Sequence, residues 1–220
     1  MDSYYRPFLI ALTGGIASGK TVVSQWFLAQ NIPVFSADKI AHEVLHDPEV
    51  QDKLIASFGS EIRQNGEIDR KKLGEIVFGS PSALAKLNSL VHPEVRRRMA
   101  EIIAESDDDY LIFEIPLLFE NGLQSAFDLT INIFTEQNWQ IERMIKRDGI
   151  SQQEAEQRIK AQMNAFDKQK LADINIANNG SISELQQRLT ALWQLIKKLK
   201  KKDVTNLLTL PLLKIPQKDN

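Results

Sequence analysis

The sequence predicts an α/β fold in which helices alternate with the strands of a parallel sheet. Short apolar runs at residues 8–12 and 32–35 are each followed by a helical pattern, and this alternation is typical of parallel sheets. Buried runs at residues 110–115 and 129–134 predict two further strands, and residues 173–177 predict a last short one. A glycine-rich turn joins the first strand to the first helix.

That turn is the most informative motif of the chain. Residues 14–21, Gly-Gly-Ile-Ala-Ser-Gly-Lys-Thr, fit the pattern Gly-x-x-x-x-Gly-Lys-Thr, which aims backbone N–H groups and a helix N-terminus at a polyphosphate. Lys20 is expected to reach the β- and γ-phosphates, and the Thr21 hydroxyl to hold Mg²⁺. An ordinary glycine-rich turn is the alternative, but the match over the whole motif, between a strand and a helix, favours a phosphate loop. The sequence therefore predicts binding of ATP or GTP.

Residues 47–106 read as a helical insertion without strands. Asp47-Pro48 and Ser80-Pro81 each resemble a helix start, with a capping side chain followed by proline. Turns are predicted at Gly59 and at Asn65-Gly66. We expect this insertion to be a subdomain over the active edge of the sheet.

The core of the predicted domain, which spans residues 1–200, is assigned to residues 7–46 and 107–200. Within it, residues 136–169 contain two charged helices that we expect to form a basic lid over the nucleotide. Residues 201–220 form a C-terminal tail behind a lysine-rich helix end. A tail with weak structure and a tail that binds a membrane surface or a partner are both open interpretations.

Composition narrows the classes of function. The 220 residues include no cysteine, which excludes disulfides, thiol catalysis and cysteine-ligated metal centres. The formal net charge of -2 gives no overall positive field, so no nucleic-acid partner is expected. The first apolar run is far too short for a signal peptide or a membrane span. We expect a cytoplasmic protein without a membrane partner, either a monomer or a weak homo-oligomer.

Asp38 is a candidate catalytic carboxylate. It follows the second predicted strand, and the ligands of an open parallel sheet gather at the carboxyl ends of its strands. A carboxylate there can accept the proton of a substrate hydroxyl. Capping of the next helix is the alternative role.

Arg143 and Arg147 lie one helical turn apart in the predicted lid. Like charges at this spacing repel each other unless an anion lies between them, which suggests a transferring phosphoryl group. Arg158 on the next helix extends the basic surface. The alternative is a solvated face paired with acidic neighbours such as Glu142 and Asp148.

His42-Glu43-Val44-Leu45-His46 matches the zinc motif of metalloproteases. Asp47-Pro48 marks a helix boundary directly after the second histidine, and no compelling third ligand follows. We therefore favour a pair of histidines at the surface or at a subdomain interface, with zinc as the alternative.

His92-Pro93 precedes three consecutive arginines that begin at Arg96. On a helix these arginines fan out, so one or two of them can face a single ligand. Binding of an anionic acceptor and simple solvation are both consistent with this pattern.

With these residues in view, the chain resembles the dephospho-coenzyme A kinases from about residue 8 to residue 199. The matching stretches are Leu12 to Ile16, Ser18 to Lys20, Ala37-Asp38, His92-Pro93, Pro116 to Glu120, Arg143, Arg147, Gln162, Ala172-Asp173 and Asn178-x-Gly180. The resemblance implies a P-loop kinase fold with a five-stranded parallel sheet flanked by helices, a helical acceptor-binding subdomain and a mobile lid.

The implied reaction transfers the γ-phosphoryl group of ATP, with Mg²⁺, to the ribose 3′-hydroxyl of dephospho-coenzyme A, the last step of coenzyme A synthesis. The resemblance implies that Lys20 and Thr21 keep their phosphate-loop roles, that Asp38 is the base and that Arg147 is the lid arginine. The catalytic candidates are thus Lys20, Asp38 and Arg147. Asp38, His92 and Arg96 are the candidates for binding the acceptor. The implied ATP-binding residues are Gly15, Ile16, Ala17, Ser18, Gly19, Lys20, Thr21, Arg143 and Asn178.

Two departures from the family pattern are expected to matter little. Ala17 stands where many relatives have glycine, and Thr21 where many have serine. Glu114, at the end of the third strand, is a further candidate for holding Mg²⁺.

Two other functions compete with this interpretation. A nucleotide-binding switch would hydrolyse slowly and signal by a change of shape, and a kinase for another small hydroxyl acceptor would share the same loop and lid. The basic lid and the long insertion favour a kinase over a switch.

Overall fold

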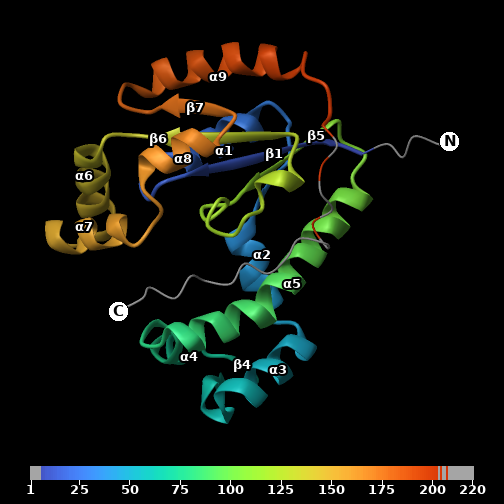
Figure 1. The fold of residues 1–220 in the computed structure, drawn as a ribbon, viewed down its shortest axis with the longest axis vertical. Helices are drawn as coiled ribbons and strands as arrows, with labels where there is room; N and C mark the ends of the chain where they lie inside the picture. Colours follow the sequence, from blue (N-terminus) through green and yellow to red (C-terminus); the bar gives the residue numbers. More distant parts are fainter. Residues whose placement is uncertain (1–5, 203, 205–206, 208–220) are drawn as a thin grey trace. The chain divides into compact units, whose positions relative to one another are not determined.

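The computed structural model describes residues 6–202, 204 and 207, which fall into two compact units. The sheet unit consists of residues 6–36, 106–202 and 204, and the helical unit of residues 37–105 and 207. Figure 1 shows the elements of each unit.

Five parallel strands form the sheet, in the order β2-β5-β1-β6-β7. Their bounds are Phe8–Gly14 for β1, Val34–Ser36 for β2, Tyr110–Glu114 for β5, Leu129–Phe134 for β6 and Ile174–Ala177 for β7. β1 lies in the middle, with every residue buried, because its apolar run can be covered on both faces. The predicted five-stranded parallel sheet is confirmed.

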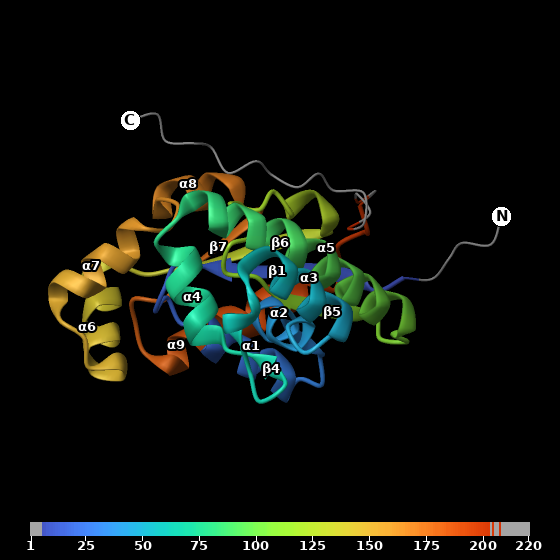
Figure 2. The ribbon, with the colours of Figure 1, turned by 90° about the horizontal axis from the view of Figure 1, so that it is seen from below.

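Helices cover the sheet and extend from it. α1 (Lys20–Ala29) and α9 (Ile182–Ile196) pack on one face, where Phe27 and Leu189 are fully buried in the main apolar cluster. α8 (Ala165–Leu171) packs against β6. α6 (Gln137–Asp148) and α7 (Gln152–Lys160) lie side by side at one end of the sheet unit, as Figures 1 and 2 show, and we call this pair the lid. In the described part of the chain, no helix has the length and apolar character needed to cross a membrane.

The helical unit is built around one long helix. α5 (Pro81–Glu105) packs against α2 (Ala37–Val44), α3 (Pro48–Phe58) and α4 (Arg70–Phe78). Asp47 and Asp69 cap α3 and α4 through their carboxylates, which accept backbone N–H groups of the first turn. α2 contacts α5 and is grouped with this unit, whereas the sequence analysis assigned residues up to 46 to the core.

The insertion also contains strands, which corrects the expectation of a strand-free segment. β3 (Arg63–Gln64) and β4 (Glu67–Ile68) form a small antiparallel hairpin. The predicted turn at Asn65-Gly66 joins them, and both residues have positive φ angles of 51° and 88°. Two-residue strands are too short to show an alternating pattern, so only their turn was visible in the sequence.

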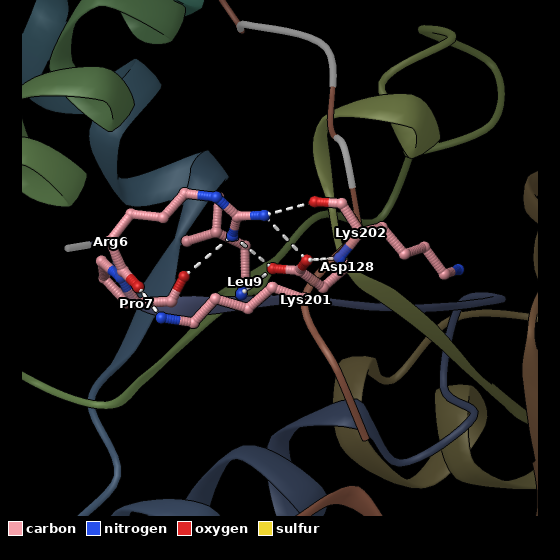
Figure 3. A network of polar contacts seen from close by, with 6 residues as sticks. All are labelled: Arg6, Pro7, Leu9, Asp128, Lys201 and Lys202. Atoms are coloured by element: carbon pink, nitrogen blue, oxygen red, sulfur yellow. Dashed lines mark hydrogen bonds and ion pairs between the residues drawn. The ribbon is translucent and has the colours of Figure 1, made fainter. Parts of the chain in front are cut away.

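At the amino edge of the sheet, where β1 and β6 begin, charged groups are tightly paired (Figure 3). The side chain of Asp128 is inaccessible to solvent and accepts hydrogen bonds from Arg6 at 2.5 Å and 2.9 Å. The backbone N–H groups of Leu9 and Lys202 donate to the same carboxylate at 2.8 Å and 2.6 Å. Burial alone pushes the pKa of Asp128 upward, but these donors more than offset it and hold the pKa below its ordinary value.

Lys201 and Lys202 therefore belong to the folded body, although the sequence analysis placed both in the tail. The Lys201 ammonium donates to the carbonyl oxygen of Arg6, and Arg6 donates to the carbonyl oxygen of Lys202 at 2.7 Å (Figure 3). The Lys202 ammonium also lies 3.0 Å from the carboxylate of Asp173. Residues 203, 205–206 and 208–220 of the predicted tail lie outside the described residues.

Candidate active site

The phosphate loop runs from the end of β1 to the start of α1, as its motif predicts. Gly19 precedes α1 with a φ of 100°, and a side chain there would collide with the amide of Asn178. A side chain at Gly14 would collide with the backbone of β6 at Ile133. These two glycines are required because the loop passes this close to its neighbours.

The Lys20 ammonium lies against the loop itself. It donates to the carbonyl oxygens of Gly14 at 2.9 Å and Gly15 at 3.0 Å. Thr21, the next residue, is exposed in the first turn of α1. The motif thus places one cation and one hydroxyl beside the positive end of a helix, which is an arrangement suited to a polyphosphate.

Ala17 is strained in a way that the sequence analysis did not anticipate. Its φ is 56°, in the left-handed region that L side chains other than asparagine and aspartate avoid. A glycine at this position would adopt the same conformation without a steric cost. The departure at Ala17, which was expected to matter little, therefore has a physical consequence for the loop.

The base of the lid is hydrogen-bonded to the loop. The guanidinium of Arg143 on α6 donates to the carbonyl oxygen of Ala17 at 3.2 Å and to that of Asn178 at 3.0 Å. It also lies 5.9 Å from the ring centre of Trp139, which is within the range of a cation–π contact. The structure thus brings Arg143 to the phosphate loop, as the sequence predicts for an ATP-binding residue.

Asn178, which follows β7, closes the same side of the loop. Its side-chain amide donates to the carbonyl oxygen of Ser18 at 2.8 Å. Its backbone carbonyl oxygen accepts a hydrogen bond from the Thr135 hydroxyl at 3.0 Å. Asn178 is 8% exposed, so its contacts are held within the protein and little affected by solvent. The predicted ATP-binding residues Arg143 and Asn178 thus meet at one side of the loop.

At the end of α6, away from the phosphate loop, the lid arginines pair with an acidic side chain instead of the loop. Arg147 has a side chain that is 61% exposed, and it pairs with Asp148 at 2.7 Å and 2.9 Å. Arg158 on α7 approaches the same carboxylate at 3.4 Å. The hydrogen bond to Asp148 raises the pKa of Arg147 and lowers that of Asp148. In this conformation, Arg147 and Arg158 pair with an acidic neighbour, which is the alternative given above for the charged lid helices. Arg143 instead contacts the phosphate loop.

Two further groups stand near the carboxyl ends of β1 and β5. Glu114, the last residue of β5, accepts a hydrogen bond at 2.7 Å from Ser24, one turn beyond Thr21 on α1. Lys168 on α8 is 1% exposed and pairs with Glu120 at 2.8 Å, while it also donates to the carbonyl oxygen of Pro116 at 3.0 Å. A buried, paired lysine therefore fixes the Pro116 to Glu120 stretch that follows β5.

Two residues of the site were not predicted from the sequence: Lys168, and Gln140 on α6, which donates to the carbonyl oxygen of Ile16 in the loop. A lysine in a charged helix gives no sign of burial, and a glutamine gives no sign of a partner 124 positions away. No local pattern in the sequence could have identified either residue.

Three predicted site residues lie in the helical unit. Asp38 is an exposed residue two positions beyond the end of β2. Because α2 begins at Ala37, Asp38 stands within the first turn and not at the cap position considered as its alternative role.

His92 and Arg96 are one turn apart on α5. Arg96 is 8% exposed, so the solvated surface considered as the alternative does not describe it. Burial lowers the pKa of His92, and the positive charge of Arg96 lowers it further, so the imidazole is neutral near pH 7. Burial also lowers the pKa of Arg96.

The other two histidines do not form a zinc motif on one helix. α2 ends at Val44, so His46 lies beyond it, and its Nδ1 atom pairs with Glu67 at 2.7 Å. The rings of His42 and His46 contact each other edge to face with centres 5.1 Å apart. Across residues 6–202, 204 and 207, no group of three or more His, Asp or Glu side chains is arranged to hold a metal ion.

Comparison with known proteins assigns this loop and lid to a family. A sequence model described as dephospho-CoA kinase matches residues 8–184. The chain belongs to the dephospho-CoA kinase family. The dephospho-CoA kinase of Oceanobacillus iheyensis is 44% identical over 195 residues, which cover 84% of this chain and 96% of that protein. The dephospho-CoA kinase of Fusobacterium nucleatum is 39% identical over 189 residues, which cover 86% and 98%.

Solved structures agree with this membership. A protein from Thermus thermophilus matches with a TM-score of 0.77 and 31% identity, over 89% of this chain and 100% of its own. A dephospho-CoA kinase from Campylobacter jejuni matches with a TM-score of 0.60 and 28% identity, over 86% and 97%. The resemblance inferred from the sequence motifs, and the five-stranded parallel sheet flanked by helices that it implied, are confirmed.

Proposed function

We propose that this protein transfers the γ-phosphoryl group of ATP to the ribose 3′-hydroxyl of dephospho-CoA, giving CoA and ADP. The observation that carries the proposal is the family match, which extends across residues 8–184 and so includes the phosphate loop, the helical unit and the lid. The contacts around the loop support it, because they provide the charge neutralisation that phosphoryl transfer requires.

In the proposed step, the 3′-oxygen of the acceptor forms a bond to the γ-phosphorus while the bond from phosphorus to the β–γ bridging oxygen breaks. ADP leaves with the electrons of that bond. Lys20 holds the β- and γ-phosphates, and Arg143 with Asn178 borders the nucleotide. Arg147 leaves Asp148 and stabilises the transferring group. A surface ion pair is worth only about 0–1 kcal/mol, so this exchange of partners costs little.

Asp38 is the proposed acceptor of the hydroxyl proton. Its place in the chain supports this role, because it follows β2 by two residues and so lies near the carboxyl end of a strand of the parallel sheet. His92 and Arg96 are proposed to bind the acceptor. A neutral imidazole can donate or accept a hydrogen bond, and a guanidinium can pair with a phosphate.

Mg²⁺ fits the oxygen groups near the loop. Thr21 offers a hydroxyl and Glu114 a carboxylate, both hard oxygen ligands of the kind that Mg²⁺ prefers. When bound with ATP, Mg²⁺ neutralises charge on the phosphate oxygens. The cytoplasmic location and the state of monomer or weak homo-oligomer stay predictions.

An assay of ADP release tests the proposal. Purified protein with ATP and Mg²⁺ is offered dephospho-CoA, other nucleosides and nucleotides, or water alone. We expect rapid ADP release with dephospho-CoA and CoA as its product. Release with water alone would favour a nucleotide switch, and faster release with another hydroxyl compound would identify a different acceptor.

Asp38→Asn tests the proposed base. Turnover should fall by roughly 10²–10⁴-fold, the usual contribution of a general base, while the affinity for ATP stays the same. Turnover is measured by ADP release and affinity by equilibrium titration. Asp38 is not the base if ATP binding weakens in parallel, or if the variant unfolds at a lower temperature with its rate intact.

A further inference from the structure

Both backbone groups of Ile16, in the phosphate loop, are bound by glutamine side chains, one on α6 and one just beyond the end of α7. The N–H group of Ile16 donates to Oε1 of Gln162 at 2.8 Å. Its carbonyl oxygen accepts from Nε2 of Gln140 at 2.7 Å. Gln140 lies on α6 and is 6% exposed, and Gln162 follows the end of α7 and is half-buried.

The two glutamines have different chemical roles. An N–H group can only donate and a carbonyl can only accept, so the backbone of Ile16 dictates which end of each amide faces it. Gln162 must present its oxygen and Gln140 its nitrogen. A carboxylate could therefore replace Gln162 as an acceptor, but it could not replace Gln140 as a donor.

Gly15 provides the room for this contact. A Cβ atom at Gly15 would lie 2.7 Å from Nε2 of Gln140, so any side chain there would push the amide away from Ile16. Gln140 can therefore reach Ile16 only because residue 15 has no side chain.

The contacts also set the direction of the loop's N–H groups. The carbonyl oxygens of Ile16 and Ser18 accept hydrogen bonds from Gln140 and Asn178, respectively. Across a trans peptide, the carbonyl of one residue and the N–H of the next point in opposite directions. Holding these two carbonyls therefore turns the N–H groups of Ala17 and Gly19 away from the groups that bind them, ready for a phosphate.

We propose that Gln140 and Gln162 are positioning residues that hold the phosphate loop in its nucleotide-binding shape and tie it to α6 and to the segment that follows α7. The proposal rests on the proposed function, in that the loop is taken as the ATP site. Neither glutamine needs to touch the nucleotide. Both act through the Ile16 peptide.

Amide hydrogen exchange of the nucleotide-free protein tests the contact itself. Gln162→Met removes the acceptor and should speed exchange at the Ile16 amide by roughly tenfold, the effect of losing about one hydrogen bond. Gln162→Glu keeps an acceptor and should retain the protection of the parent protein. Equal exchange in the two variants would overturn the proposal.

Nucleotide binding tests the consequence. Gln140→Met and Gln162→Met should each raise the Kd of a fluorescent ATP analogue with Mg²⁺ by roughly 3–10-fold, with little change in the KM for dephospho-CoA. Gln157, which is exposed on α7, supplies the matched control, and Gln157→Met should leave the Kd unchanged. A lower Tm with an unchanged Kd in the two test variants would mean a purely structural role and would overturn the proposal.

Gly15→Ala keeps both glutamines and displaces one contact. Combined with Gln140→Met, its effect on Kd should be smaller than the product of the separate effects, because both changes remove the same hydrogen bond. Independent effects would contradict the proposal. Lys20→Ala separates this inference from the function on which it rests: if that variant binds the analogue normally, the loop is not the ATP site and both fail.

Discussion

The two edges of the sheet use charge differently. At the amino edge, the buried carboxylate of Asp128 meets the guanidinium of Arg6 and two backbone donors. At the carboxyl edge, the cations Lys20 and Arg143 donate to backbone carbonyl oxygens, and Arg147 on the lid forms an ion pair with Asp148 that is largely exposed.

This difference indicates that the amino edge contributes mainly to stability and the carboxyl edge mainly to ligand binding. A cation paired with a buried carboxylate is neutralised within the fold and contributes mainly to folding, whereas a cation in an exposed ion pair can exchange its partner for an anion at little cost. The amino edge should therefore affect stability without turnover, and the carboxyl edge with its lid should affect turnover with little effect on stability. Each of the following changes tests one side of this comparison.

Arg147→Ala should have the largest effect. It removes a cation proposed to stabilise the transition state, so kcat should fall by roughly 10²–10⁴-fold. Steady-state kinetics measures this, and ATP affinity and Tm should change little because Arg147 is held only by an exposed ion pair.

The matched variant Arg147→Lys keeps the charge but lacks the forked geometry, so it should recover only part of the rate. If Arg147→Ala lowers Tm and keeps the kcat of the parent protein, Arg147 stabilises the fold and does not act in phosphoryl transfer. The proposed difference between the two edges would then not extend to the lid.

Arg6→Met should lower stability while leaving kcat near that of the parent protein. Removing one partner of a buried pair costs about 3 kcal/mol, at the low end of such losses because Leu9 and Lys202 still donate to Asp128. For a chain of this size, Tm should fall by roughly 6–12 °C in calorimetry.

The loss should also depend on pH in a set direction. The folded-state pKa of Asp128 is held below its ordinary value of 3.8, so the stabilisation from its ionised form is present above that pH and disappears as the pH falls. The two proteins should therefore differ most near neutral pH and converge in acid. A gap in stability that stays constant down to pH 2 would rule out Asp128 as its source.

Truncation tests the same edge with a smaller effect. A chain that ends at Lys200 lacks the contacts of Lys201 and Lys202, whereas a chain that ends at Lys202 keeps them. We expect the shorter chain to be less stable by about 1–3 kcal/mol in urea unfolding, with equal kcat at 25 °C. Equal stability of the two chains would show that these lysines are dispensable for the fold.

Ala17→Gly should have the smallest effect. Relief of the left-handed strain at φ 56° favours the variant, and the extra freedom of glycine in the unfolded chain opposes it, for a net gain of about 0–1 kcal/mol. Urea unfolding measures this difference. A clear loss of stability would mean that the methyl group of Ala17 makes a contact that outweighs the strain.

The fold was predictable where an element is determined by residues that are close together in the sequence. The apolar runs that became β1 and β6 are buried almost throughout, and the phosphate-loop motif carries its own turn and helix start. The β3–β4 hairpin was missed because two-residue strands have no period. The cost of Ala17 was missed because a residue letter does not reveal its φ angle.

The candidate site was predictable only in part, for a related reason. Lys20 and Asn178 belong to motifs, but what each touches depends on how distant elements pack. Gln140 contacts a residue 124 positions away, and Lys168 is paired with Glu120 across the sheet unit. Such polar contacts follow from the packing of β6, α6 and α8, which no local pattern encodes.

The pairing of Arg6 with Lys202 has a consequence for engineering. The Arg6 guanidinium lies 2.7 Å from the Lys202 carbonyl oxygen, so residues distant in the sequence meet at one point on the sheet unit. A short glycine–serine linker could join residue 202 to residue 6, and new ends could be opened at the exposed turn of Asn65-Gly66. Such a circular permutant would keep the phosphate loop and the lid each intact, on opposite sides of the new linker.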